Sequence, residues 1–448
     1  MAFRQLLFKP LAEGDRNEVL NIYHGARRIF NITGWVVLAL AAILAFGFPF
    51  FADSPLDYYQ TVGTFFLLAL PHGLSYFLMG PNFVIMADQK EYKINIWIQS
   101  ISILRMVFMV LAIILKLPFI AILIIEAANI LCANWMARWV ALKAYPWLKE
   151  PAKNPNDSSF KKKASYAMIQ RLSELATTQT DNIVISGFMG YAMSSVYGTY
   201  SYLTDNIGKI TQTMVQSPMN SFGNLFNDKH RDRYAVFLEF FNFSTYISTI
   251  VACAIYIVLP QFVPIWMRNP LYEVSIPVCV CLGLNIFYMT LRQPVIIARD
   301  TNGLYVDAKN NAYLLAIVKV VLSILLVKPL GLFGVALATT LSYWTIDLFY
   351  NPNLVYTRVF HRKTTEYYSL VFIRLAIALG IAFVGNVIWQ MYFVERCVNV
   401  MSLILNIILI GCFILVLTTC IYWFCFGSFR NLFYRFMSII KKRSAKER

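Results

Sequence analysis

Long apolar runs constrain this chain more than any other feature of its sequence. Twelve stretches contain about 20 or more mostly apolar residues, the length that a helix needs to cross about 30 Å of hydrocarbon. Barrel strands would instead appear as short segments of alternating polarity. The runs cover residues 32–52, 61–86, 94–115, 117–139, 164–190, 194–223, 235–266, 273–298, 310–328, 331–357, 367–394 and 401–427. The sequence therefore predicts an all-α polytopic membrane protein with about 12 transmembrane helices.

The basic residues predict how these helices are oriented. Of the 39 Lys and Arg residues, 28 lie at the two ends or in every second connection, and the alternate connections hold only four. Cytoplasmic loops carry this excess of positive charge. We therefore expect a multi-pass membrane protein with both termini in the cytoplasm. The net charge of +16 then favours contact with anionic membrane lipids, and no nucleic-acid partner is expected.

Three polar stretches flank or interrupt the apolar runs. Residues 1–31 are mixed in charge, which is unlike a signal peptide. Asp15 is expected to cap a short amphipathic helix lying against the cytoplasmic face. Residues 142–163 contain three prolines and three consecutive lysines, and they predict a linker between two lobes. Residues 428–448 form a basic tail.

The runs 180–187 (TDNIVISG) and 196–200 (VYGTY) resemble the opening of the second lobe in polysaccharide transporters, the O-antigen flippase type of the multidrug/oligosaccharidyl-lipid/polysaccharide flippase superfamily. The run 331–340 (GLFGVALATT) is similar to a late family signature, and 10–15 (PLAEGD) is similar to the loop between its second and third helices. The order of these matches agrees with the order in the family.

The resemblance implies two lobes of six helices, followed by two additional helices. Four runs precede the predicted linker and eight follow it, so this chain is expected to lack the first two helices of its N-lobe. A boundary near residue 227 would give six plus six helices but fits the linker less well. The expected parts are a cytoplasmic segment 1–31, an N-lobe 32–141, a linker 142–163, a C-lobe 164–357, two additional helices 358–427 and a tail 428–448.

Charged residues within the membrane indicate where the function lies. An ionisable side chain at the bilayer centre costs about 2.5–3.5 kcal/mol on insertion scales, so it usually faces water or a partner charge. Arg171, Glu174 and Asp181 share one face of the fifth predicted helix, because residues three and four apart are neighbours. The next helix carries a similar polar face, formed by Asp205, Lys209, Gln212 and Gln216. These two faces are predicted to line a hydrated path.

A lipid-linked oligosaccharide carries a pyrophosphate and sugars, and the candidate residues follow from that chemistry. Arg171, Lys209 and Arg292 are the cationic candidates for the phosphates. Tyr202, Gln212 and Gln216 are candidates for the sugar, with weaker support for Asn285 and Tyr288. Glu174, Asp181, Asp205 and His72 are candidates for coupling to a proton or a sodium ion.

Structural pairing is the competing interpretation of these charges. Arg171 with Glu174, and Asp205 with Lys209, would then neutralise each other within one helix. Lys319 and Asp347 are expected to pair across helices, and Arg374 and Glu239 to extend towards the membrane surface. For His72 the competing interpretation is a side chain that satisfies the kink at Pro71.

The leading hypothesis, which the resemblance implies, is a flippase that moves an undecaprenyl-pyrophosphate-linked oligosaccharide outward across the bacterial inner membrane by alternating access. The oligosaccharide would serve O-antigen, capsule or exopolysaccharide synthesis. Polysaccharide assembly proteins are possible partners, and no cofactor, metal or enzymatic activity is expected, because no nucleotide-binding loop or metal-ligand spacing occurs. An exporter of organic cations in the same superfamily is the alternative. A polytopic glycosyltransferase or polymerase is disfavoured, because every outward loop is short.

Overall fold

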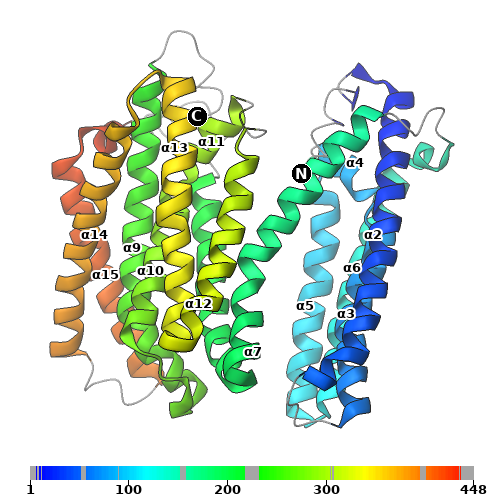
Figure 1. Ribbon diagram of the computed structural model, residues 1–448, viewed down its shortest axis with the longest axis horizontal. Coiled ribbons are helices and arrows are strands. Elements are labelled where there is room, and N and C mark those ends of the chain that lie inside the picture. Colours follow the sequence, from blue (N-terminus) through cyan, green and yellow to red (C-terminus); the bar gives the residue numbers. More distant parts are fainter. Residues whose placement is uncertain are drawn as a thin grey trace, which may run out of the picture. The chain divides into compact units, whose positions relative to one another are not determined.

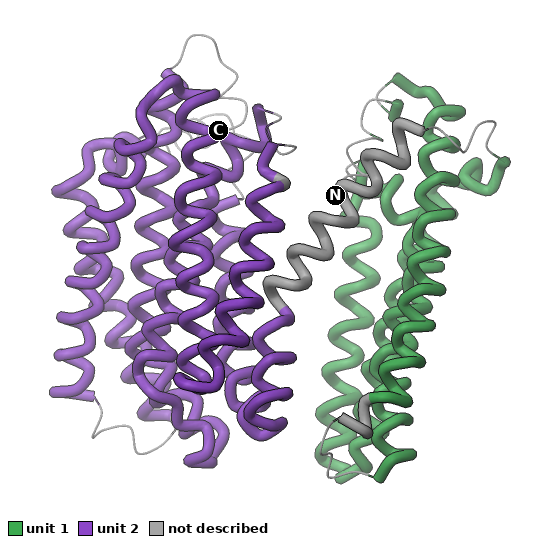
Figure 2. Tube along the Cα trace, in the orientation of Figure 1, with its two compact units in different colours: residues 1–171 green, residues 172–448 purple. Residues whose placement is uncertain are grey.

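The computed structural model describes most of the chain as helices. Side chains are not described at 48–51, 158–178, 309 and 400. The described backbone comprises residues 7, 10–11, 13–51, 57–88, 90–151, 158–216, 232–302, 304, 307–393, 400–432 and 434. By contacts the chain divides into unit 1, Met1–Arg171, and unit 2, Leu172–Arg448, which Figure 2 shows in green and purple. Each unit is described by itself, and the lobe and linker boundaries expected from the sequence stay a prediction.

Unit 1 is a bundle of four long helices. They are α2 (Arg16–Phe51), α3 (Tyr58–Leu78), α5 (Tyr92–Ile114) and α6 (Phe119–Ala144), with the short α4 (Asn82–Ala87) and the 3-10 turn η1 (Pro146–Lys149). α2 packs on α3, and α6 packs on both α3 and α5. Buried apolar side chains near one end of these helices, among them Leu20, Val84 and Ala141, pack into one hydrophobic core.

The N-terminal segment differs from its prediction. Asp15 does cap a helix, because its carboxylate accepts a hydrogen bond from the backbone N–H of Glu18. That helix is not a separate amphipathic element, however, because it continues as α2 into the first apolar run. Leu20 and Tyr23 are buried in the same core as Val84. The apolar face that suggested contact with a membrane surface is covered by protein.

Unit 2 is built around α9 (Arg233–Met267), which contacts α10, α11, α14 and α15. The remaining α-helices, labelled in Figure 1, are α7 (Ser158–Gln216, shared with unit 1), α10 (Ile276–Leu291), α11 (Gln293–Thr301), α12 (Lys309–Ser342), α13 (Leu348–Val355), α14 (Thr364–Tyr392) and α15 (Val400–Cys425). Three short elements lie between them: η2 (Pro270–Tyr272) and the π-helices η3 (Tyr343–Asp347) and η4 (Tyr356–Phe360).

Two of these elements, α7 and α12, are helical hairpins. Their direction changes at Gly190 (φ 84°) and Gly331 (φ 59°), where a left-handed backbone favours glycine. A Cβ on Gly334 would lie 2.1 Å from the carbonyl oxygen of Leu326, a contact that a straight helix would not allow across eight residues. We call residues up to each glycine the first arm and those after it the second arm.

The hairpins account for the number of predicted helices. Among the described residues, nine helices are long and apolar enough to cross a membrane, and one of them, Asn310–Phe360, contains both arms of the α12 hairpin. The two arms of α7 carry the predicted runs 164–190 and 194–223. The prediction of an all-α polytopic protein with about 12 transmembrane segments is therefore confirmed.

Candidate functional site

A polar stripe follows the exposed side of the second arm of α7. Asp205, Lys209 and Gln216 are exposed, Tyr202 is 66% exposed, and Gln212 is half-buried. Their spacings of three and four residues place them along one side of the helix. We call these five residues the α7 stripe. It contains four of the six main residues that the sequence predicted for contact with sugar and phosphate, and the other two are Arg171 and Arg292.

The α7 stripe differs from the surfaces of unit 2 that suit lipid. The exposed large side chains of α15 are apolar, among them Leu405, Ile408 and Phe424. A charge facing hydrocarbon is costly, so a membrane helix turns charged residues towards protein or a water-filled path. Because unit 2 itself leaves Asp205 and Lys209 uncovered, the stripe is suited to line a hydrated path.

The two charges of the stripe do not form the ion pair that the competing interpretation required. Among the described side chains, no ion pair joins Asp205 to Lys209, although they lie one helical turn apart. The residues Asp205 and Lys209 thus present opposite charges separately to the exposed side of unit 2. An anionic group and a cationic group of one ligand would each find a partner there.

The stripe reaches the break between α10 and α11. The Gln216 side chain donates a hydrogen bond to the Gln293 side chain at 3.0 Å, and the Gln293 amide donates to the carbonyl of Met289. Gln293 is only 3% exposed. Its neighbour Arg292 occupies the break itself. The Gln216 end of the stripe is therefore held against the element that carries Arg292, the third cationic candidate.

Arg292 takes part in a buried network rather than facing the path freely. Its Nη1 lies 2.9 Å from Asp347 Oδ2, and its guanidinium lies over the ring of Tyr343. The side chain of Arg292 is 19% exposed and that of Asp347 only 2%. The Tyr288 hydroxyl also donates to Asp347, at 3.0 Å. Arg292 is thus mainly committed to a structural ion pair, and Tyr288 is too deeply buried to meet a sugar.

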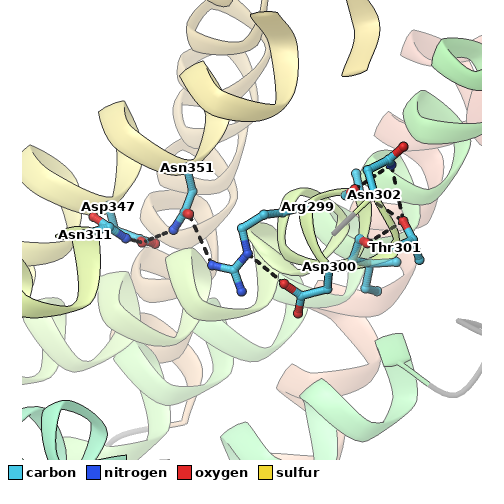
Figure 3. Close-up of polar contacts among 9 residues, drawn as sticks. Arg299, Asp300, Thr301, Asn302, Asn311, Asp347 and Asn351 are labelled. Atoms are coloured by element: carbon cyan, nitrogen blue, oxygen red, sulfur yellow. Dashed lines mark hydrogen bonds and ion pairs between the residues drawn. The ribbon is translucent and has the colours of Figure 1, made fainter. Parts of the chain in front are cut away.

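Two asparagines extend this network along the helices. Asn311 and Asn351 each donate a 2.6 Å hydrogen bond to Asp347 Oδ1. Arg299 donates to the Asn351 side chain at 3.2 Å and also pairs with Asp300 (Figure 3). The π-helix η3 ends at Asp347 and sets the direction in which its side chain leaves the helix. This Asp347 network joins α10, α11, α12 and α13.

Asp181 is also paired, and its partner is Lys319. The Lys319 Nζ lies 3.1 Å from Asp181 Oδ1, and both residues are buried. The hydroxyls of Tyr197 and Thr339 each donate to Asp181 Oδ2 at 3.3 Å. Lys319 and Asp347 therefore each pair across helices but not with one another: Lys319 pairs with Asp181, and Asp347 pairs with Arg292.

The remaining predicted residues fall into three groups. Arg171 and Glu174 lie outside the described side chains. His72 is exposed within unit 1, and its carbonyl accepts a hydrogen bond from Ser75. Arg374 was wrongly expected to extend to the membrane surface: it is 3% exposed and donates two hydrogen bonds to Asn242.

Glu239 differs from its prediction in the same way, since it is 6% exposed. Sequence reasoning did not single out Asn311, Asn351, Thr339 or Tyr197 as partners of the buried acids. The sequence does indicate such partners in one way, because each is an amide or hydroxyl side chain within an otherwise apolar run. That signal alone does not tell which acid such a side chain will meet.

Comparisons with known proteins support the fold. No protein-family model matches this chain, and no curated protein sequence matches it. Among solved structures, the chain is similar to one described as "Lipid II flippase MurJ, inward closed conformation", with a TM-score of 0.67 and 14% sequence identity. The similarity covers 94% of this chain and 89% of MurJ. At this identity the comparison shows the fold alone: the chain has a helical fold similar to that of MurJ.

Proposed function

We propose that this membrane protein is a flippase that moves a lipid-linked oligosaccharide from the cytoplasmic to the outer leaflet. The observation that carries the proposal is the α7 stripe, a charged surface that unit 2 leaves uncovered within a fold similar to that of a lipid II flippase. Such a substrate needs a polar path for its headgroup, whereas its lipid tail can stay in the bilayer. The two parts of the substrate match the two kinds of surface that unit 2 offers.

Each part of the headgroup has a suitable partner on the stripe. Lys209 supplies a cation for a phosphate oxygen, as a point charge with three N–H donors. Gln212 and Gln216 supply amide donors and acceptors for sugar hydroxyls, and Tyr202 supplies an aromatic face with a hydroxyl. Arg292 has a secondary role, because its guanidinium is already paired with Asp347.

The exposed carboxylate of Asp205 favours a second candidate function, the export of organic cations. An exposed carboxylate one turn from Lys209 would also suit an organic cation, the substrate expected of a multidrug exporter in the same superfamily. The two functions differ in which charge of the stripe is essential. A flippase for an anionic headgroup depends on Lys209, and a cation exporter depends on Asp205.

Ligand binding to the purified full-length protein separates the two functions. Binding of an undecaprenyl-pyrophosphate-linked oligosaccharide and of tetraphenylphosphonium would be measured in nanodiscs for Lys209→Gln and Asp205→Asn. Loss of one charge-assisted hydrogen bond weakens affinity roughly tenfold or more. We expect Lys209→Gln to weaken binding of the oligosaccharide lipid by that factor.

Lys143→Gln is the matched control, because Lys143 is an exposed lysine at the end of α6 that lies over the ring of Trp139. It should leave binding of the oligosaccharide lipid unchanged. Tight binding of tetraphenylphosphonium that Asp205→Asn abolishes, together with no binding of the oligosaccharide lipid, would establish the exporter and reject the flippase.

A further inference from the structure

The Asp181–Lys319 pair lies where the two helical hairpins meet. Asp181 is on the first arm of α7 and Tyr197 on its second arm. Lys319 is on the first arm of α12 and Thr339 on its second arm. All four arms therefore contribute one polar side chain to a single cluster. At the ends of the hairpins, a Cβ on Gly331 would lie 3.3 Å from the Met189 side chain, so the two turns are also in contact.

The two carboxylate oxygens of Asp181 are satisfied in different ways. Oδ2 accepts directed hydrogen bonds from the hydroxyls of Tyr197 and Thr339. Within the described part of the chain, Oδ1 accepts no aligned hydrogen bond, and its charge is balanced by the Lys319 ammonium at 3.1 Å. The contact with Oδ1 thus depends on charge and distance rather than on a direction.

A buried carboxylate within the membrane requires a nearby positive charge. The ammonium of Lys319 meets this requirement as a compact point charge on a flexible stem. A carboxylate flanked by hydroxyl oxygens is also the set of hard oxygen ligands that small metal cations prefer. Lys319, which is 3% exposed, occupies the position from which a cation would balance Oδ1.

We propose that Lys319 is a tethered cation that takes the place of a dissociable monovalent ion at Asp181. Unit 2 then needs no alkali ion for its stability. The charge of Asp181 is permanently balanced by Lys319, although a carboxylate is the kind of group that binds a coupling ion. The ion specificity of this position is set by Lys319. Removing its side chain should expose Asp181 Oδ1 together with the buried hydroxyl of Ser323, one turn further along α12, to a small cation.

The test measures the thermal unfolding of the full-length protein in sodium, potassium and choline chloride at equal ionic strength. The melting temperature of the wild-type protein should be the same in all three salts. Lys319→Ala should melt roughly 5–15 °C lower in choline chloride, because it leaves a buried charge unpaired. Sodium or potassium should restore part of that loss, in proportion to the logarithm of ion concentration.

Two further variants identify the site. Lys319→Arg keeps the tethered charge and should show no ion dependence. The double variant Asp181→Asn/Lys319→Ala has neither charge and should lose the recovery in sodium and potassium. Persistence of the recovery in the double variant would place the ion elsewhere and overturn the proposal, and so would equal melting of Lys319→Ala in all three salts.

The wild-type protein provides a test that does not depend on folding of the variants. Binding of radioactive sodium or of a potassium surrogate such as rubidium would be measured on the purified protein, with Asp181→Asn as the reference. The proposal predicts equal, background binding for both proteins. Saturable binding to the wild-type protein that Asp181→Asn abolishes would show that Lys319 does not exclude the ion.

Discussion

The substitution Asp347→Asn separates a structural role of the Asp347 network from a role in transport. It keeps the size of the side chain but removes the negative charge that balances Arg292 at 2.9 Å. Arg292 would then hold a charge in a largely buried position, and Asn311 and Asn351 would lose part of the acceptor that they share.

The expected loss follows from the burial of both partners. Their side chains are 19% and 2% exposed, so water can solvate the remaining guanidinium only in part. Removing one partner of a buried ion pair costs about 3–5 kcal/mol of unfolding free energy. For a unit of this size that corresponds to a melting temperature lower by roughly 6–15 °C.

Thermal unfolding in nanodiscs measures this loss, and two comparisons interpret it. Asp300→Asn breaks the neighbouring ion pair with Arg299, in which the Asp300 side chain is 39% exposed. It should cost about 0–1 kcal/mol, as exposed pairs do. The double variant Arg292→Met/Asp347→Asn removes both buried charges, keeps an amide oxygen at position 347 as an acceptor for Asn311 and Asn351, and should recover most of the stability that Asp347→Asn loses.

A change of less than about 2 °C for Asp347→Asn, equal to that for Asp300→Asn, would refute this reasoning, because the network would then contribute less than roughly 1 kcal/mol. A double variant that is no more stable than Asp347→Asn would also contradict it. In that case the loss would come from altered packing and not from an unpaired charge.

Three other predictions concern separate parts of the chain. Burial opposes ionisation of the Asp88 carboxyl, but hydrogen bonds from Lys90 and Tyr145 outweigh this effect, so the pKa of Asp88 lies below its ordinary 3.8. The ionised carboxylate therefore stabilises the folded protein above pH 3.8, and this contribution is lost as the pH falls through the lower pKa of the folded state. Asp88→Asn should remove this part of the acid sensitivity seen in melting curves. Gly190→Ala should cost about 1–2 kcal/mol because φ is 84°, and chemical denaturation would measure it. Arg374→Met should lower the melting temperature by several degrees, because it removes the two hydrogen bonds that Arg374 donates to the Asn242 side chain. An unchanged melting temperature would show that these hydrogen bonds contribute nothing to stability.

The limits of the predicted apolar runs agree with the turns of the two hairpins, although the hairpins themselves were not predicted. Gly190 and Gly331 each separate two apolar runs that are long enough to span a membrane, and a left-handed backbone at the turn favours glycine. The N-terminal helix was predicted less well. Its apolar residues Leu20 and Tyr23 have the same spacing whether a membrane surface or a protein core covers them, so periodicity alone did not distinguish the two.

The candidate site could be predicted only in part for a related reason. The spacing of Asp205, Lys209 and Gln216 follows from helical geometry, so one exposed face was predictable. The partners of Asp181 and Arg292 were not, because they lie on other helices and depend on how α7, α10 and α12 pack. A charge within a membrane segment indicates that a partner or water is needed, but it does not tell which.

Lipid translocation in proteoliposomes shows whether Lys209 on the α7 stripe carries a lipid-linked headgroup across the membrane. The purified protein would be reconstituted with a fluorescent undecaprenyl-pyrophosphate-linked oligosaccharide, and the fraction that a membrane-impermeant quencher reaches would be followed over time. The account predicts that the wild-type protein and Lys143→Gln equilibrate the lipid between leaflets, and that Lys209→Gln does so roughly tenfold more slowly at unchanged melting temperature. Equal rates for the wild-type protein and Lys209→Gln, or no rate above that of protein-free liposomes, would contradict it.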